Sequence, residues 1–233
     1  MKKENKIKEI IKLNQKYRAN EFNGVETEES NFKIIQGNVP ILLSAPHAVR
    51  QCRNGVVKPA DQLTGPIVEL LCERTGASGI VRTFNLCDDP NSENVGYGLA
   101  YKKAILELIK KNGIQCIFDI HGCSDEHGFD IDIGTNKGIN ISKNKKFLNI
   151  ITEKFKRVGK VAVDKKFKSS KYSTVSNYIH RKSKMPCFQL EINTLVRKDP
   201  NMLLVLLDSF EDIIKELTNE MEKKKALESE LEI

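Results

Sequence analysis

The chain has 233 residues, and its 38 Lys and Arg against 31 Asp and Glu give a formal net charge of +7 at pH 7. This length is typical of one large α/β domain, and no apolar run approaches the ~20 residues that a membrane-spanning helix needs. The first residues are basic but lack the apolar core of a secretory signal, so we expect a cytoplasmic protein with no membrane partner.

Helices and strands alternate along the predicted chain. Apolar residues recur at helical spacing over residues 3–16, 64–76, 97–111, 142–158 and 200–221. Short apolar runs predict strands over residues 32–35, 39–44, 79–84, 114–120, 129–133, 161–163 and 186–192. The alternation predicts one three-layer α/β/α domain over residues 1–233 with a mixed, mostly parallel sheet, and a charged helix or tail from about residue 200.

Two details of this pattern are specific enough to test. Gln36-Gly37-Asn38 lies between the first two predicted strands, which predicts a β-hairpin. Residues 129–133 alternate apolar and acidic side chains, which predicts a half-buried strand toward a sheet edge. Residues 50–58 are polar and predict a loop.

The stretch from Gly113 to Gly122 is the most informative part of the chain. Residues 114–120 are almost continuously apolar, as is typical of a parallel strand buried on both faces. Asp119 and His121 come at its end, and ligands of open α/β sheets bind beyond the carboxyl ends of the strands. His47 follows the end of another predicted strand.

Two further acidic residues complete a candidate metal site. Asp61 follows a loop within reach of His47, and Glu191 interrupts an apolar strand, where an unpaired carboxylate is costly. Two histidines and one carboxylate are the ligands of many catalytic zinc sites. We therefore expect one zinc ion on His47, Asp61 and His121. Glu191 is expected to act as the general base, and Asp119 to orient a ligand ring.

Each of these residues also has a purely structural explanation. His47 could cap a loop, Asp61 could bind the first backbone amides of a helix, and Glu191 could pair with an arginine. Independent accidents would not all fall at strand ends or inside a core strand, so the set favours a site. His127 and His180 lie in polar or basic segments and are expected at the surface.

The cysteines and lysines carry weaker signals. The six cysteines form no C-x-x-C pair, and most are expected to be reduced. Lysine is spread over the chain, with denser stretches at 143–146, 165–171 and 223–225. A solvated surface explains this composition as well as an anionic ligand does. No aromatic interleaving accompanies the charge, so nucleic acid is not expected as a partner.

Short motifs, taken in order over about residues 39–197, resemble the N-formylglutamate amidohydrolase family. They are Leu42-Leu-Ser-Ala-Pro-His47, Arg53-Asn-Gly with Lys58-Pro-Ala-Asp61, Asp89-Pro-Asn91, Asp119-Ile-His-Gly122, Asp132-Ile-Gly134 and Gln189-Leu-Glu-Ile-Asn193. That family is related to the zinc carboxypeptidases and to the aspartoacylase and succinylglutamate desuccinylase group. The resemblance implies a phosphorylase/hydrolase-like fold, one zinc ion and hydrolysis of the amide bond of a small N-acylated amino acid.

The resemblance also implies roles for single residues. His47 and His121 match the metal histidines of the family, Asp61 falls where an acidic ligand is expected, and Glu191 matches the catalytic glutamate. The loop between His47 and Asp61 is longer than in carboxypeptidases, where the acid follows the first histidine by three residues.

The expected substrate-binding residues depart from the family pattern. Relatives often have an arginine after the asparagine of the third motif, and it holds the substrate carboxylate. Here Ser92 follows Asn91. The expected substrate-binding set is therefore Asn91 with Arg82 or Arg53, or else Arg50, because a guanidinium suits bidentate carboxylate binding.

Two other functions stay open at this point. One is a carboxypeptidase-like or cell-wall peptide amidase activity on short peptides, which a wide cleft would favour. The other is a non-catalytic anion- or nucleic-acid-binding protein on a hydrolase scaffold, which the net charge and the missing arginine would favour.

Overall fold

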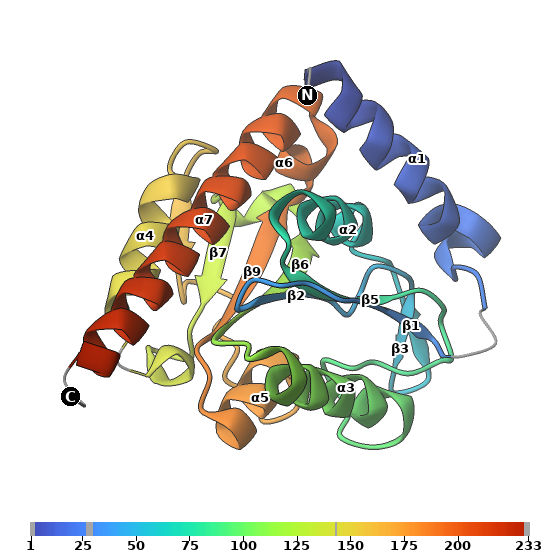
Figure 1. Ribbon diagram of the computed structural model, residues 1–233. Helices are drawn as coiled ribbons and strands as arrows, with labels where there is room; N and C mark the ends of the chain where they lie inside the picture. The colour runs from blue at the N-terminus through green and yellow to red at the C-terminus, as the bar shows by residue number, and fades with distance from the viewer. Residues whose placement is uncertain (1–2, 27–29, 143, 231–233) are drawn as a thin grey trace.

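The computed structural model describes residues 3–26, 30–142 and 144–230 (Figure 1). Seven strands form one sheet in the order β1-β5-β2-β6-β9-β7-β8. The four central strands are parallel: β5 (Ser78–Arg82), β2 (Ile41–Ala45), β6 (Cys116–Cys123) and β9 (Cys187–Asn193). Two outer strands are antiparallel to their neighbours: β1 (Phe32–Ile35) pairs with β5, and β7 (Ile131–Gly134) pairs with β9. The last strand, β8 (Val161–Val163), runs parallel to β7. The predicted mixed, mostly parallel sheet is confirmed.

Helices cover both faces of this sheet (Figure 1). One face carries α1 (Lys3–Phe22), α2 (Thr64–Thr75), α4 (Lys145–Phe155), α6 (Thr194–Lys198) and α7 (Pro200–Glu230). The other face carries α3 (Gly96–Asn112) and α5 (Val175–Ser183). Successive side chains of a strand point to opposite faces, so Leu43 packs in the core on the α2 and α7 side and Leu42 in the core under α3 and α5.

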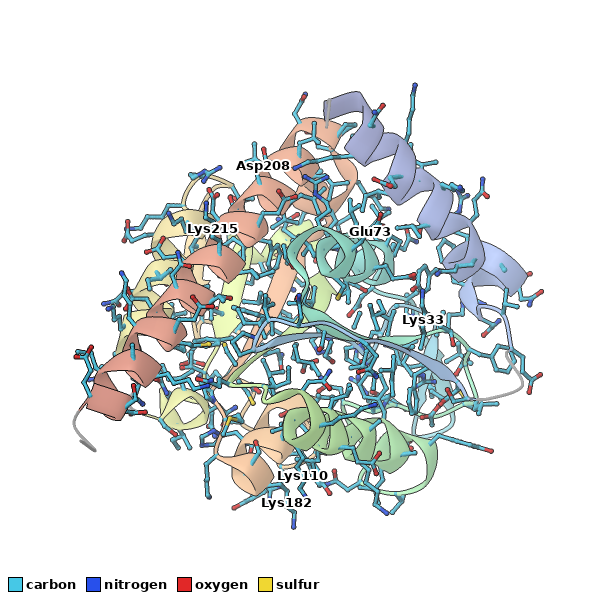
Figure 2. All side chains as sticks on the ribbon, viewed as in Figure 1. Lys33, Glu73, Lys110, Lys182, Asp208 and Lys215 are labelled. Atoms are coloured by element: carbon cyan, nitrogen blue, oxygen red, sulfur yellow. A yellow bond between two sulfur atoms is a disulfide. The ribbon has the colours of Figure 1, made fainter. Side chains whose placement is uncertain are left out.

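The long helix α7 illustrates why the outer surface is charged. It buries one apolar stripe, namely Leu203, Leu206, Leu207, Phe210, Ile213, Ile214, Leu217 and Met221. Asp208 and Lys215 lie on its outer side, as Lys110 and Lys182 do on α3 and α5 (Figure 2). These lysines belong to solvated helix faces. No helix within the described ranges is both long and apolar enough to cross a membrane.

The predicted hairpin between residues 32–35 and 39–44 is wrong. β1 pairs with β5, and β5 lies between β1 and β2. The intervening segment passes over the end of α2 instead of turning tightly. Asn38 and Val39 donate their backbone N–H groups to Gly76 O, and a Cβ on Gly37 would lie 2.3 Å from the same oxygen. The glycine there permits this close approach.

Three smaller expectations also need correction. β7 is buried along its whole length rather than half-buried, because it lies between β9 and β8. The polar segment after residue 50 forms a two-stranded hairpin of β3 (Gln51–Arg53) and β4 (Val56–Lys58). His180 is buried, and its Nδ1 donates to Met185 O at 2.8 Å.

The cysteines divide into two groups. Cys72, Cys116, Cys123 and Cys187 are free and buried, in line with the prediction that most are reduced. Cys52 and Cys87 form a disulfide that the sequence did not indicate. It joins β3 to the loop after β5.

Candidate metal centre and active site

Three adjacent parallel strands bring the candidate residues to one edge of the sheet. His47 follows β2, His121 lies in β6, and Glu191 lies in β9. The strand β6 extends two residues beyond His121. Asp61 comes from a loop: the chain leaves after His47, forms the β3–β4 hairpin and returns, so that Asp61 N donates to His47 O at 2.8 Å. This excursion explains the long spacing between the two residues.

The side chains of His47, Asp61 and His121 converge on a common point. The two Nδ1 atoms lie 3.2 Å apart, and Asp61 Oδ2 lies 3.3 Å from His47 Nδ1 and 3.4 Å from His121 Nδ1. Ligand atoms 2.0–2.1 Å from a tetrahedral zinc centre are separated by about 3.3–3.4 Å. The three distances therefore match three corners of one zinc tetrahedron.

The opposite nitrogen of each ring faces a carboxylate. His47 Nε2 lies 2.8 Å from Asp89 Oδ1, and His121 Nε2 lies 3.2 Å from Asp119 Oδ2, although this second pair is not aligned for a hydrogen bond. A carboxylate only accepts, so Asp89 favours the tautomer of His47 with its proton on Nε2, and Asp119 is placed to favour the same tautomer of His121. In this tautomer both Nδ1 atoms present lone pairs to each other and to Asp61. Three acceptors facing one another need a cation, and a His₂–carboxylate set suits zinc.

The electrostatics of the ligand set also favour positive charge. Burial lowers the pKa of His47, but the charge of Asp89 and the hydrogen bonds that a protonated ring donates to Asp61 and Asp89 outweigh it and raise the pKa above its ordinary value. Burial also lowers the pKa of His121, but Asp119 and Asp61 outweigh it and raise this pKa well above its ordinary value. Although burial raises the pKa of Asp61, the two histidines hold it well below its usual range. The Asp61 side chain makes no cap to α2.

Glu191 stands beside the ligand set. It is the direct register partner of His121 in the pairing of β9 with β6, and side chains of paired residues project from the same face of a sheet. Gln189 Nε2 donates to Glu191 Oε1 at 2.9 Å. Burial raises the pKa of Glu191 to about 8; the charge of His121 acts to lower this pKa, and the charge of Asp61 acts to raise it. Glu191 forms no ion pair with an arginine in the ranges the structure describes.

A cavity of about 830 Å³ opens above these residues. His47, Asp61, His121 and Glu191 all line it. Its walls come from the β3–β4 hairpin, the loop around Asn91 and the segment of residues 166–171. This volume lies in the upper part of the range for small-molecule sites.

The predicted substrate-binding residues occupy different places. Asn91 and Arg53 line the cavity. Asn91 Oδ1 accepts from Val175 N at the start of α5, and Arg53 donates to Asp89 Oδ2. Arg82 is fully buried, does not line the cavity and forms a bidentate pair with Asp88. Arg50 also lies outside the lining, where it pairs with Glu21 at 3.4 Å.

The structure adds two residues to which the sequence analysis assigned no role. Asp89 holds the His47 ring, and its only sequence signal was its place in the motif Asp89-Pro-Asn91. Arg197, on α6, is buried in the cavity wall. Its guanidinium donates to four oxygens in three segments: Gln62 O, Cys123 O, Ile192 O and Thr194 Oγ1.

Comparison with known proteins shows the fold. No protein-family model matches the chain, and no curated protein sequence is significantly similar. Solved structures with a similar fold include N-formylglutamate amidohydrolase from Ralstonia eutropha JMP134. It is 12% identical, with a TM-score of 0.65 over 84% of this chain and 99% of that one. The predicted α/β/α fold, which this amidohydrolase structure shares, is confirmed.

Two further neighbours share the fold less closely. A bacteriophage poly-gamma-glutamate hydrolase is 17% identical, with a TM-score of 0.52 over 83% of this chain and 93% of that one. A metallo-carboxypeptidase from Burkholderia cenocepacia is 14% identical, with a TM-score of 0.52 over 86% of this chain and 61% of that one.

Proposed function

We propose that the protein is a zinc-dependent amidohydrolase that cleaves the amide bond of a small N-acylated amino acid or a short peptide. The observation that carries the proposal is the convergence of His47, Asp61 and His121, with Glu191 in register beside them, on the floor of one cavity. The structural neighbours named above are an amidohydrolase, a poly-gamma-glutamate hydrolase and a metallo-carboxypeptidase, and their activities support the same class of reaction.

The roles of the side chains follow from their surroundings. When bound, a zinc ion lowers the pKa of a water molecule and polarises a carbonyl group. Asp89 accepts from Nε2 of His47 and so favours a free Nδ1, and Asp119, 3.2 Å from Nε2 of His121, would do the same for that ring when the site is loaded. Glu191, whose pKa burial raises to about 8, can take a proton from water and return it to the leaving amine nitrogen.

Arg53 is our candidate for holding a substrate carboxylate. Its Nε and Nη2 bind Asp89 Oδ2, which fixes the guanidinium, while no described residue binds Nη1. The N–H groups of Arg82 donate to the Asp88 carboxylate and to Phe84 O, so Arg82 supports the loop that carries Asp89. Asn91 keeps its Nδ2 group for the substrate, because only Oδ1 is used at α5.

A short peptide is favoured over a formylated amino acid by the size of the cavity. A volume of about 830 Å³ lies in the upper part of the range for small-molecule sites, which leaves room for a short peptide. The proposed activity therefore includes the carboxypeptidase-like and peptide amidase reactions, in which the substrate is a peptide.

The experiment is an amine-release assay on the zinc-loaded protein. N-formylglutamate, N-acetylglutamate and short glutamate-containing peptides are tested before chelation, after chelation and after zinc is restored. We expect turnover that disappears with the metal and returns with it. Glu191→Gln should lower turnover by about 10²–10⁴-fold, whereas Glu126→Gln, an exposed control outside the lining, should not. Undiminished turnover in Glu191→Gln would remove the assigned base.

A further inference from the structure

The lining of the cavity is strongly biased toward positive charge. Its basic side chains are Arg53, Lys58, Lys166, Lys168, Lys171 and Arg197. Its acidic side chains are Asp61 and Glu191 alone, and both face the candidate metal centre. The open part of the cavity therefore presents cations without interspersed carboxylates, although acidic residues make up almost half of the charged residues of the chain.

Three of these lysines come from one segment, residues 164–174, which we call the lysine segment. Its backbone is fixed from below by β7. The Asp132 carboxylate accepts from the backbone N–H groups of Lys165, Lys166 and Phe167 at 2.8–3.1 Å. A Cβ on Gly134 would lie 2.3 Å from Phe167 O, so the segment passes directly over this glycine.

The rest of the lysine segment is fixed as well. In its middle, Ser169 O accepts from the amide groups of Asn140 and Asn177 at 3.2 and 3.3 Å. Near its end, Tyr172 O accepts from Arg181 Nη2 at 2.9 Å. The backbone is thus held at both ends, while the side chains of Lys166, Lys168 and Lys171 are exposed and line the cavity. This arrangement fixes where the positive charges stand without neutralising them.

The amines of the lining have few partners inside the protein. Within the described ranges, no carboxylate lies within ion-pairing distance of the Nζ atoms of Lys58, Lys168 and Lys171. Lys166 Nζ lies 3.0 Å from His127 Nδ1. Some lysines elsewhere are paired, for example Lys6 with Asp208 and Glu211, and Lys16 and Lys33 with Glu69. The amines of Lys58, Lys168 and Lys171 are thus available to anionic groups of a ligand in the cavity.

The number of amines indicates how many anionic groups the lysine segment can hold. Lys166, Lys168 and Lys171 offer three separate amines to the cavity. A single N-acylated amino acid brings one or two carboxylates, which is fewer than these amines can bind. A chain that repeats carboxylates can reach several.

The rest of the lining distinguishes an acidic peptide from a nucleic acid. Phe167 is the one Phe, Tyr or Trp in this lining, and the two imidazole rings face the candidate metal centre. Proteins that bind single strands instead stack successive bases on several aromatic side chains. Amide hydrolysis also requires an amide in the substrate. Resting on the proposed function, we infer that the substrate is an acidic peptide chain whose carboxylates lie along the lysine segment and the β3–β4 hairpin, on either side of the amide to be cleaved.

The test measures binding separately from hydrolysis. Fluorescent hexaglutamate and hexaglutamine, both with blocked ends, are titrated into zinc-loaded protein that carries Glu191→Gln, which keeps the cavity and blocks turnover. The cavity variant removes three charges by Lys166→Gln, Lys168→Gln and Lys171→Gln. The control variant removes three charges from outer helix faces (Figure 2) by Lys110→Gln, Lys182→Gln and Lys215→Gln. Equal melting temperatures establish that both variants fold.

We expect hexaglutamate to bind and hexaglutamine not to bind. Three exposed charge pairs of ordinary strength together change a Kd by about tenfold, so the Kd for hexaglutamate should rise about tenfold in the cavity variant. It should change less than about twofold in the control variant. Binding should also weaken as ionic strength rises from about 0.01 to 0.15 M.

Three results would overturn the inference: no binding of hexaglutamate, equal weakening in the cavity and control variants, or stronger competition by a DNA oligonucleotide than by unlabelled hexaglutamate. Failure of the proposed function has a different signature. In that case hexaglutamate still binds as described, but the zinc-loaded protein with native Glu191 cleaves neither peptide nor N-acylated amino acid.

Discussion

His47 Nε2 donates to Asp89 Oδ1 at 2.8 Å, while the other oxygen of the same carboxylate accepts from Arg53. These contacts link Arg53, Asp89 and His47, and so join the cavity lining to the candidate metal centre. Asp89 is completely buried, and these partners hold its pKa below its usual range although burial opposes this. A permanently ionised Asp89 fixes the tautomer that leaves His47 Nδ1 free for a cation.

Asp89→Asn should therefore weaken zinc binding while leaving the ligands in place. An amide can present its NH₂ group to His47 Nε2, which favours the other tautomer. Loss of such a carboxylate partner typically costs 10–100-fold in metal affinity, and we expect the zinc Kd, measured by competition with a chelating dye, to rise by about this factor. Asp125→Asn, at an exposed position, is the control. An unchanged zinc Kd would show that Asp89 does not orient the ring.

Arg197 should act as a positioning residue for the same centre. It ties together the segment after Asp61 and the ends of β6 and β9. Arg197→Lys retains the charge but cannot reach four oxygens at once, so we expect the zinc Kd to rise about tenfold. Arg197→Met should in addition lower the free energy of unfolding by about 2–4 kcal/mol. Lys198→Met, at the exposed neighbour, should do neither.

Gly122→Ala tests the position of the Arg197 guanidinium by a second route. An added Cβ would lie 2.4 Å from Arg197 Cζ, so the guanidinium must move. We expect this substitution to weaken zinc binding in the same direction as Arg197→Lys, and the double variant to be little worse than either single one, because both remove one interaction. Additive losses in the double variant would indicate two independent effects.

The stability of the fold should depend on pH through Glu69 on α2. Burial raises the pKa of Glu69, but hydrogen bonds from Lys16, Lys33 and Tyr17 outweigh this and hold the pKa below its ordinary value. A lowered pKa in the folded state contributes stability that is present above the ordinary carboxyl pKa and is lost as the pH falls through the folded value.

Glu69→Gln should therefore lower the free energy of unfolding at pH 7 by about 1–3 kcal/mol, and should flatten its fall between about pH 5 and pH 3. Urea unfolding at several pH values measures both. Glu73→Gln, at an exposed position on the same helix (Figure 2), is the matched control and should leave the profile unchanged. Parallel profiles for the native protein and Glu69→Gln would contradict the role of this carboxylate.

The disulfide between Cys52 and Cys87 predicts the number of free thiols in the protein. Thiol titration of the unfolded protein without reductant should find the four free cysteines, and six after reduction. A bond that closes a loop between residues 35 apart stabilises a fold by about 4 kcal/mol in the chain-entropy account. The variant Cys52→Ser with Cys87→Ser should lose about this much and give four thiols in both conditions. Six thiols without reductant would mean that these cysteines are reduced.

Sequence patterns predicted the elements better than their pairing. Apolar runs located the central strands, because a strand buried on both faces is apolar along most of its length. The alternation of apolar and acidic residues located β7, and short apolar runs located the partly exposed β1 and β8. The predicted partner of β1 was wrong, because nothing in the local sequence distinguishes pairing with β2 from pairing with β5. The contact of Gly37 with Gly76 decides it, and this contact exists only in the folded chain.

The candidate site shows the same division. His47, His121 and Glu191 stood out because each interrupts or ends an apolar strand. Asp61 was reached through its spacing and through the family resemblance, and the structure brings it to the histidines by way of the β3–β4 hairpin. Arg197 has no pattern to find, because its role depends on backbone oxygens of three segments that meet only in the fold.

The central claim is that His47, Asp61 and His121 hold a metal ion, and metal analysis of the purified protein tests it most directly. The protein is prepared without chelator and compared with a His47→Ala and His121→Ala double variant. We expect about one zinc ion per chain in the native protein, and less than about a tenth of that in the variant. A native protein that contains no metal, even after incubation with zinc, would contradict the account.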